Sequence, residues 1–559
     1  MEELLPYGTS ARPSVVPLRA DTVSLPSTPP TVDLLSKLPP EIAAHYADPT
    51  NLLRPDLPAF PAPVAARPRH GGGGASAEYH KLILRLRDLR MVDFTTAPLV
   101  VNGVFAVPKP NNKQRLIIDA RPANAVFVPS PPVKLPSPAD LAAMEASGPF
   151  FVAGLDVSDF FHRLRLPEAF RPYFALPPVP GAVVGRPEEL VWPMCTTLPM
   201  GWSHSVFVAQ AVHEHFVDSD PDLRDQPRVG RDRRVDPATG VHSVYIDDFN
   251  VFGPLPLVEH HFVSGQERYP ANDLPNNIKK DVPPAAEADA IGLHVNGSRG
   301  RLEVPVDKIN KLLAATAHLL LLGACSGDDM ARLLGHWTWP MLLRRPSLSV
   351  FNAVYRFVVA AGSRVRRLWP SVRNELHAIC ALAPLLWTSV NDDWFDKVVA
   401  FDASTLGAGV CCASASPDDI AAEQDLFVRN GAAVTLDQVL DAGDMAQAPL
   451  ELPLGAARWS TIISRQWRWD DHINLLEVQA AILALRWVLS HPRALGSRVL
   501  LLGDSQVALG CLAKGRSSSF RLLRLLRRAA ALILSSGLRP SYRWLPSAAN
   551  PADGPSRLQ

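Results

Sequence analysis

The chain has 559 residues, with 56 Lys and Arg against 55 Asp and Glu, and 47% of its residues are hydrophobic. This length predicts about three to five domains with ordinary cores, and the formal net charge of +1 indicates no particular partner. Its six cysteines lack disulfide or zinc spacing, and its start MEELLPYG does not resemble a secretory signal. No apolar run is long enough for a membrane span. We therefore expect an intracellular protein of the cytoplasm or nucleus that is not secreted and has no membrane partner.

Residues 1–80 contain 14 of the 54 prolines and end near the run Gly71-Gly72-Gly73-Gly74. No apolar period is sustained there. Such a composition is typical of chain that cannot bury enough apolar surface to fold alone. We therefore predict a Pro-rich disordered arm over residues 1–80, with a flexible glycine hinge.

Residues 81–304 alternate between helical and strand patterns. A short helix is predicted from about residue 82, followed by a hairpin with its break at Asn111-Asn112. The apolar strand from Phe151 to Val157 closes with Asp156, and a second strand pair surrounds Asp247-Asp248. Residues 218–240 are charged and rich in Pro and Gly, which predicts a surface insertion.

The last two segments differ in their periodicity. Residues 305–396 are rich in Leu and Ala at helical spacing, with almost no strand signal. Residues 397–559 alternate strands and helices, interrupted at 413–456 by a segment with eight acids and one Arg, which predicts a solvated loop insertion. The whole chain is therefore predicted to be α/β (α+β).

Asp156, Asp247 and Asp248 form a first set of acids. Asp247 and Asp248 cannot both point the same way in a regular strand, but at a hairpin tip they can converge with Asp156. Carboxylates so close repel each other strongly, and divalent cations between them relieve the repulsion, as in two-metal phosphoryl transfer. A lone Asp-Asp pair is more often a solvated turn.

This pair is accompanied by further motifs. The segment Tyr245-Ile246-Asp247-Asp248 resembles the Y-x-D-D box of reverse transcriptases, and residues 155–161, LDVSDFF, resemble their first palm motif. Residues 198–203, LPMGWS, resemble the L-P-x-G-W box, and residues 105–109 and 115–124 resemble the fingers strands. The boxes occur in the family's order, and residues 218–240 lengthen one gap.

The resemblance implies a right-hand polymerase, with fingers and palm in residues 81–304 and a helical thumb or connection in 305–396. It implies that Asp156, Asp247 and Asp248 hold two Mg²⁺ ions, with Mn²⁺ as a substitute. It also implies a nucleotide site formed by Lys109, Arg115, Phe161, Met200 and Gly201. Three features depart from the family: Met200 replaces a frequent Gln, Asn277–Lys280 matches a lysine region loosely, and Ala290-Ile291-Gly292 replaces F-L-G.

A second set of acids follows in residues 397–559. Asp402 and Asp504 end strands, Glu477 opens a helix, and Asp553 lies in a late segment. Converging at one sheet edge, they would again require two cations and support phosphodiester hydrolysis. The set resembles the D-E-D-D pattern of ribonuclease H, which implies that all four acids are catalytic metal ligands. The family's loop His is missing from 505–559, and 75 residues separate Asp402 from Glu477.

Arg521, Arg524 and Arg528 lie at i, i+3 and i+7, so one helix face is basic. This face either binds hybrid phosphates or is simply solvated. Residues 480–559 carry 12 Arg and Lys against two Asp, which also favours a polyanion.

Together these features predict an RNA-directed DNA polymerase with tethered ribonuclease H, similar to retrotransposon Pol and most like DIRS-like elements. Its predicted partners are an RNA template, a DNA primer, dNTPs and the RNA/DNA hybrid, whereas the oligomeric state is not indicated. Two alternatives stay open: a domesticated or decayed protein that binds nucleic acid without catalysis, and a protein in which only the nuclease is active.

Overall fold

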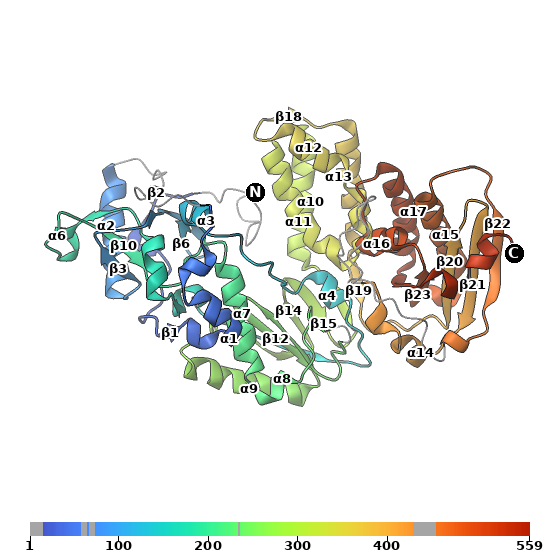
Figure 1. The fold of residues 1–559 in the computed structure, drawn as a ribbon, viewed down its shortest axis with the longest axis horizontal. Helices are drawn as coiled ribbons and strands as arrows, with labels where there is room; N and C mark the ends of the chain where they lie inside the picture. Colours follow the sequence, from blue (N-terminus) through green and yellow to red (C-terminus); the bar gives the residue numbers. More distant parts are fainter. Residues whose placement is uncertain (1–14, 57–63, 66–72, 233–234, 429–453) are drawn as a thin grey trace.

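The computed structural model describes residues 15–56, 64–65, 73–232, 235–428 and 454–559. Three units lie in a row: the N-terminal unit (residues up to 304), the helical unit (305–396) and the C-terminal unit (397–559) (Figure 1). Helices and strands alternate through the first and third units, which confirms the predicted α/β architecture. Within the described ranges, every helix is too short or too polar to cross a lipid bilayer.

The prediction of a disordered arm is wrong for residues 15–56. This segment forms 3-10 turns, the short strand β1 (Val32–Asp33) and helix α1 (Pro40–Tyr46). Val23, Leu34 and Tyr46 are each at most 2% exposed and belong to the main core. Because its elements are short and separated by irregular chain, its apolar residues show no sustained period and rely on contacts with distant residues. The rest of the arm lies outside the described residues, apart from 64–65 and the start of α2.

Helix α2 (Gly73–Asp88) begins inside the glycine run that was expected to form a hinge. It precedes a three-stranded sheet in the order β3-β10-β9 (Val92–Thr95, Leu190–Cys195, Val179–Pro180). The predicted hairpin is confirmed as β5 (Gly103–Lys109) and β6 (Lys113–Asp119). Asn111 and Asn112 both have positive φ, of 62° and 55°, which asparagine tolerates better than most residues.

The central sheet has the order β11-β12-β7-β13 (Val241–Tyr245, Asp248–Gly253, Phe151–Asp156, Val282–Ala285). Helices α7 (Ser205–Asp218) and α9 (Leu255–Ala271) pack against it. Strand β7 is almost wholly buried, which explains its continuous apolar run. A second sheet, β14-β15-β16-β19, extends the unit (Glu287–Ala290, Leu293–Asn296, Arg301–Glu303, Trp387–Ser389).

Residues 218–240 are not a purely exterior insertion. Helix α8 (Pro221–Arg224) lies there, and Val229 is only 2% exposed within a core cluster. The guanidinium of Arg228 is 4% exposed and pairs with Asp218. The charged residues that indicated an exposed loop therefore partly neutralise each other inside the fold.

The helical unit consists mainly of α10 (Val306–Leu322), α11 (Gly327–Leu343), α12 (Ala353–Ala361) and α13 (Pro370–Leu382). Trp337, completely buried, lies at its centre, where its indole donates a 2.9 Å hydrogen bond to Thr316. The sequence indicated almost no strand here, yet β19 pairs with β16 of the N-terminal unit. Three residues are too few for a strand pattern, so only the pairing reveals it.

The C-terminal unit contains a five-stranded sheet in the order β22-β21-β20-β23-β24 (Ser460–Gln466, Gly407–Ser414, Lys397–Ala403, Arg498–Gly503, Arg539–Trp544). Strands β20, β23 and β24 run parallel, and β21 and β22 run antiparallel to their neighbours. Helices α15 (Ile473–Val488) and α17 (Phe520–Ser536) pack together, with α16 (Gln506–Lys514) and α18 (Asp553–Ser556) nearby.

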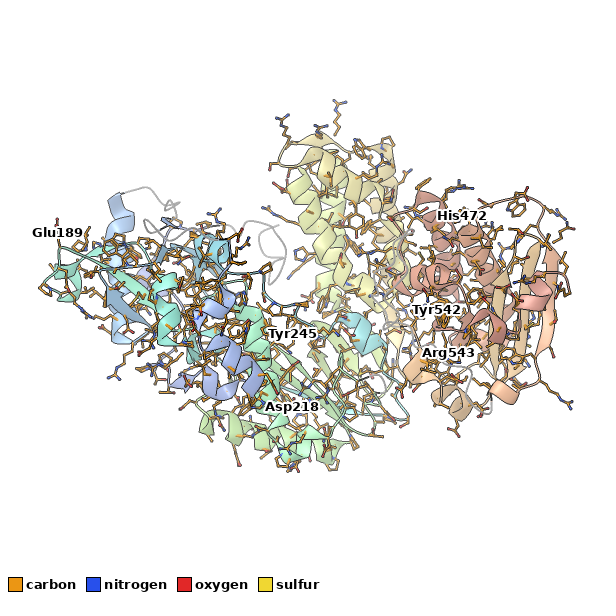
Figure 2. The ribbon with its side chains drawn as sticks, viewed as in Figure 1. Glu189, Asp218, Tyr245, His472, Tyr542 and Arg543 are labelled. Atoms are coloured by element: carbon orange, nitrogen blue, oxygen red, sulfur yellow. The ribbon has the colours of Figure 1, made fainter. Side chains whose placement is uncertain are left out.

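The acidic insertion at 413–456 is not simply a solvated loop. Strand β21 extends into it, and helix α14 (Pro417–Ala421) follows. Glu423 is fully buried and forms a 2.7 Å ion pair with Arg543, itself fully buried; Figure 2 places Arg543 inside the C-terminal unit. Part of the local excess of acid thus neutralises a buried cation. Residues 429–453 lie outside the described residues.

Two arginines, Arg498 and Arg527, join the C-terminal unit to the other two. Arg527 on α17 donates to the carbonyls of Ser349 and Val350 and contacts Glu375 at 2.8 Å. Arg498 on β23 donates to Met144 and Val390 and pairs with Glu145 at 2.8 Å. Part of the basic surplus of residues 480–559 is therefore used for contacts between units.

Candidate active sites

The first predicted cluster lies at one end of the central sheet. Asp156 is the last residue of β7, and Asp248, the first residue of β12, is its direct cross-strand partner. Asp247 lies in the turn between β11 and β12, after Ile246. The expected hairpin tip is confirmed, and the turn lets Asp247 escape the alternation of a regular strand. Tyr245, which precedes the turn, lies near the middle of the molecule (Figure 2).

All three acids line one cavity of about 300 Å³, together with Lys280 and Lys308. Burial raises the pKa of Asp248 to about 7, with further contributions from Asp247 and Asp156. Burial and Asp156 also raise the pKa of Asp247. The cluster thus holds more negative charge than its surroundings stabilise.

Lys280 lies against this cluster. Its Nζ is 2.7 Å from Oδ2 of Asp156, and the backbone N–H of Asn277 donates to the carbonyl of Asp156 at 2.7 Å. The loop after the hairpin therefore provides one cation to the acids. An oxygen-only set of carboxylates, in which burial raises the pKa of Asp247 and Asp248, suits a hard divalent cation, and the residues present fit such an ion.

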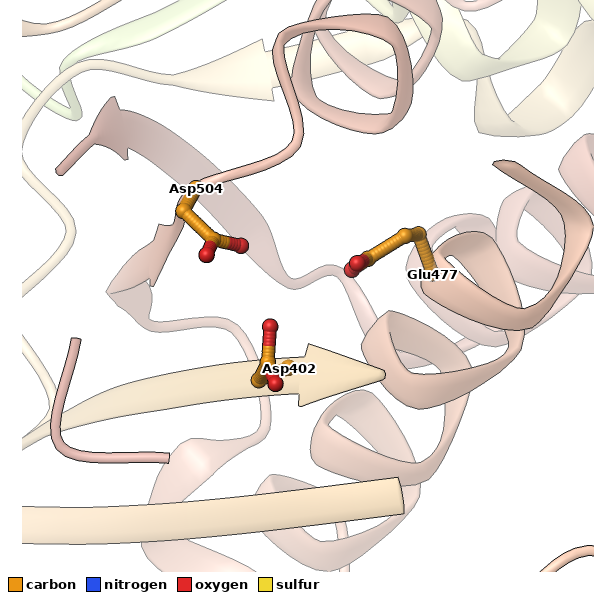
Figure 3. Close-up of side chains that lie close together, drawn as sticks. All are labelled: Asp402, Glu477 and Asp504. Carbon is orange, nitrogen blue, oxygen red and sulfur yellow. The ribbon is translucent and has the colours of Figure 1, made fainter. Parts of the chain in front are cut away.

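The second predicted cluster is more tightly assembled. Asp402 on β20, Glu477 on α15 and Asp504 after β23 each place one carboxylate oxygen within 4.8 Å of the others. Figure 3 shows the three side chains pointing toward a common centre. Among the described residues, these three acids meet the 4.8 Å limit, whereas Asp156, Asp247 and Asp248 do not. The carboxylate oxygens of the first cluster are therefore farther apart.

Burial shapes the electrostatics of this second cluster. Glu477 is 6% exposed and Asp402 is 4% exposed, and Oε2 of Glu477 is buried without a hydrogen-bond partner. Burial, then Asp402 and Asp504, raise the pKa of Glu477 to about 9. Burial and neighbouring acids raise that of Asp402 to about 6. A divalent cation would satisfy the orphaned oxygen and the repulsion together.

These shifts predict how pH affects the metal-free chain. The folded pKa of Glu477 lies above its usual 4.5, so the folded state binds the proton more tightly. The stability contributed by this group is fully present below pH 4.5 and is lost as pH rises toward 9. In EDTA, we expect the free energy of unfolding to be about 2 kcal/mol lower at pH 9 than at pH 5. For a unit of this size, that difference lowers Tm by roughly 4–8 °C.

Thermal unfolding between pH 5 and 9, with EDTA or Mg²⁺, measures this effect. Added Mg²⁺ is expected to stabilise the chain more at pH 8.5 than at pH 6, because binding requires the deprotonated acids. The matched control is Glu477→Gln, which should flatten the pH dependence. An equally steep fall in that variant would contradict the assignment to Glu477.

Asp553, the fourth predicted acid, does not belong to this tight group. It lies at the start of α18, and its carboxylate accepts hydrogen bonds from Arg557 at 2.9–3.2 Å. It remains near enough to raise the pKa of Asp402. The ion pair with Arg557 keeps Asp553 at the margin of the cluster in this structure.

The predicted nucleotide-binding cations lie together on the hairpin. The charges of Lys109 and Arg115 add to burial in lowering the pKa of His162 to about 4. The charge of Arg115 also offsets part of the rise in the pKa of Asp247. Cations from β5 and β6 therefore lie within electrostatic range of His162, which follows Phe161 directly, and of the first acid cluster. Lys109 also donates to Ser24 at 3.0 Å, a contact from the segment expected to be disordered.

Two other predicted nucleotide-site residues, Met200 and Gly201, lie in a loop held against β6. The N–H of Ile118 donates to the carbonyl of Met200 at 3.0 Å. Gly201 has φ +136°, and a Cβ there would lie 2.0 Å from the carbonyl oxygen of Ile118; this close approach requires glycine. Met200 is half-buried, and Phe161, also half-buried, packs on the main core.

Arg521, Arg524 and Arg528 are all exposed on α17. Arg521 pairs with Asp471 at 2.6 Å. The neighbouring Arg527, which the sequence pattern did not single out, points instead into the contact with the helical unit. The basic face expected on this helix is therefore confirmed as an exposed surface.

Sequence reasoning did not assign three residues that contact the first cluster. Lys280 was present only as a loose motif match. Gln210 and His213 on α7 hydrogen-bond the backbone of Ile246, and the sequence signal for them was a polar residue on an otherwise apolar helix face. His213 lies in the His213-Glu214-His215 run, which suggested no function.

Comparisons with known proteins give partial matches. No protein-family profile matches the chain. It is 35% identical over 106 residues to the Gag-Pro-Pol polyprotein of Human T-cell leukemia virus 2, which covers 19% of the chain. It is 28% identical over 187 residues, or 33% of the chain, to that of Bovine leukemia virus (isolate Australian). These alignments span only 7% and 12% of the polyproteins themselves.

Two solved structures were also matched. One is a foamy viral protease-reverse transcriptase dRH in complex with double-stranded DNA, at 14% identity and a TM-score of 0.44, covering 91% of this chain and 80% of the other. The second is a foamy viral protease-reverse transcriptase in complex with an RNA/DNA hybrid, at 12% identity and a TM-score of 0.42, covering 91% and 82%.

Proposed function

We propose that this protein is an RNA-directed DNA polymerase with a tethered ribonuclease H, which copies retroelement RNA into DNA and degrades the RNA of the hybrid. The observation that carries the proposal is the presence of two separate acid clusters on one chain, each suited to divalent cations. The local similarity to Gag-Pro-Pol polyproteins supports the same conclusion.

In the polymerase, Asp156, Asp247 and Asp248 would hold two Mg²⁺ ions, and Mn²⁺ would substitute. Bound there, the ions would supply activation of the attacking 3′-oxygen and charge stabilisation for the leaving pyrophosphate. Lys109 and Arg115 would neutralise the triphosphate of the incoming dNTP, while Met200 and Gly201 would line its path. Phe161 would lie under the sugar and exclude a 2′-hydroxyl.

In the nuclease, Asp402, Glu477 and Asp504 would hold two Mg²⁺ ions, with Asp553 joining them once it leaves Arg557. Bound there, the ions would supply activation of a water for hydrolysis of the RNA phosphodiester. The exposed Arg521, Arg524 and Arg528 would contact hybrid phosphates, so cleavage should weaken as salt rises.

The described units correspond in this proposal to fingers and palm (81–304), helical thumb or connection (305–396) and ribonuclease H-like domain (397–559). The motifs favour a DIRS-like retroelement as the source. All six cysteines are free thiols, which fits the intracellular location we propose.

Primer extension on poly(rA)/oligo(dT) with dTTP and Mg²⁺ tests the polymerase. We expect extension by the wild-type chain that EDTA abolishes and that excess Mg²⁺ restores. A purified, folded chain that fails to extend any RNA-templated primer would refute the polymerase and favour the domesticated, non-catalytic alternative.

A second candidate is a protein that retains only the nuclease. The closer approach of the carboxylates of Asp402, Glu477 and Asp504 favours this candidate. The ion pair between Asp156 and Lys280 favours it as well, because it already neutralises one acid of the first cluster. Digestion of a labelled RNA/DNA hybrid alongside the extension assay separates the two. Cleavage without extension would support the nuclease-only protein.

A further inference from the structure

The turn that carries Asp247 and Asp248 has an unfavourable backbone conformation. Ile246 has φ +55°, a region that β-branched residues rarely adopt. Such a conformation persists only where the surrounding structure fixes it. The contacts that fix Ile246 therefore also determine where the two following carboxylates lie.

Both polar groups of Ile246 are held by side chains from α7. The backbone N–H donates to Oε1 of Gln210 at 2.7 Å, and Nε2 of Gln210 donates to the carbonyl of Val244 at 2.9 Å. The carbonyl of Ile246 lies 2.6 Å from Nδ1 of His213. Because a carbonyl can only accept, Nδ1 of His213 carries the proton.

Tyr269 on α9 completes the arrangement. Its hydroxyl lies 2.6 Å from Nε2 of His213, and it must donate because Nε2 of this tautomer accepts. His213 is fully buried, and its ring lies 5.5 Å from that of Phe160, centroid to centroid. Phe160 lies in the segment that follows β7 and Asp156, so the His213 ring packs beside that segment as well as against the turn.

Packing alone does not require a histidine at this position. Several of its neighbours on α7 are apolar, including the buried Val212 and Phe216, and an aliphatic side chain would fill the space without two hydrogen bonds to satisfy. The imidazole instead links two elements: it contacts α9 through Tyr269 and the turn between β11 and β12 through Ile246.

We propose that His213, oriented by Tyr269, is a positioning residue that holds the Ile246 carbonyl and thereby fixes where Asp247 and Asp248 would hold the metal ions. This inference rests on the proposed polymerase function. In this proposal, His213 touches neither the substrate nor the side chains that would bind the metal ions, and it acts only through the turn.

Three variants test the proposal. His213→Leu removes both hydrogen bonds, His213→Asn keeps an amide donor at the place of Nδ1, and Tyr269→Phe removes only the hydroxyl. His215→Ala, on the same helix but outside these contacts, is the matched control. We expect His213→Leu to lower kcat for extension about 100-fold, the loss typical of displacing catalytic groups by about 1 Å, with KM for dTTP nearly unchanged.

Two further readouts separate positioning from folding. Hybrid cleavage by the same molecules should stay at the wild-type rate, since its acids lie in the C-terminal unit. Amide hydrogen exchange in a peptide covering residues 241–250 should accelerate in His213→Leu. His213→Asn should recover at least tenfold of the lost kcat, and Tyr269→Phe should lose less than His213→Leu.

Several outcomes would overturn the inference. These are extension by His213→Leu close to the wild-type rate, parallel loss of extension and cleavage in both His213 variants, or no recovery in His213→Asn. If the wild-type chain itself does not extend a primer, the proposed function fails first. If it extends and His213→Leu does too, only this inference fails.

Discussion

Asp247→Asn is expected to lower primer extension about 10³-fold. The substitution keeps the size of the side chain but removes a charge that would hold the metal ions, whose stabilisation of the transition state is worth several kcal/mol. Asp247 lies in the turn, where burial and Asp156 already raise its pKa. The measurement is the single-turnover rate of nucleotide addition on poly(rA)/oligo(dT) with saturating dTTP and Mg²⁺.

The same preparation provides the control for folding. Asp247→Asn should cleave an RNA/DNA hybrid at the wild-type rate, because the second cluster is built from other strands. Asp222→Asn, an exposed acid on α8, is a matched substitution that should leave extension unchanged. Extension by Asp247→Asn within tenfold of the wild-type rate would remove this residue from the metal site.

Asp504→Asn is expected to show the opposite pattern, with hybrid cleavage reduced about 10³-fold and extension retained. Asp504 contributes one of the three converging oxygens, and it accepts a 2.5 Å hydrogen bond from Ser547. The loss should follow from the missing charge, since two ions cannot be held as well by Asp402 and Glu477 alone. The measurement is the initial rate of release of labelled RNA fragments.

Ser547→Ala separates the charge of Asp504 from its hydrogen bond. This variant should lose much less cleavage than Asp504→Asn, because the carboxylate remains. Equal cleavage by wild type and Asp504→Asn would refute the assignment of the second cluster. A loss of both extension and cleavage in Asp504→Asn would indicate a folding defect. An unchanged Tm in this variant would exclude such a defect.

Much of the local structure could be predicted because its determinants are local. The continuous apolar run in β7 and the strand–turn–strand pattern around Asp247 depend on neighbouring residues. The same holds for the hairpin at Asn111-Asn112, where asparagine accepts positive φ. The strand patterns also placed Asp156, Asp402 and Asp504 at strand ends.

Long-range packing explains where prediction failed. Residues 15–56 show no periodicity, yet they fold because Val23 and Tyr46 bury against distant elements. Glu423 belonged to a segment that looked solvated, and only the approach of Arg543 from β24 explains its burial. Composition reports the average cost of burying a segment, whereas a specific partner determines the burial of one residue.

By itself, the sequence determined the main strands and helices around the two clusters and which acids end the strands, since these features depend on local periodicity and turn chemistry. Only the tertiary structure decided which oxygens converge. It brought Glu477 to Asp402 across 75 residues, left Asp553 on Arg557, and placed Lys280 and His213 around the first cluster. The physical reason is that carboxylate geometry and pKa depend on distance in space and on burial, and neither is encoded in residue spacing along the chain.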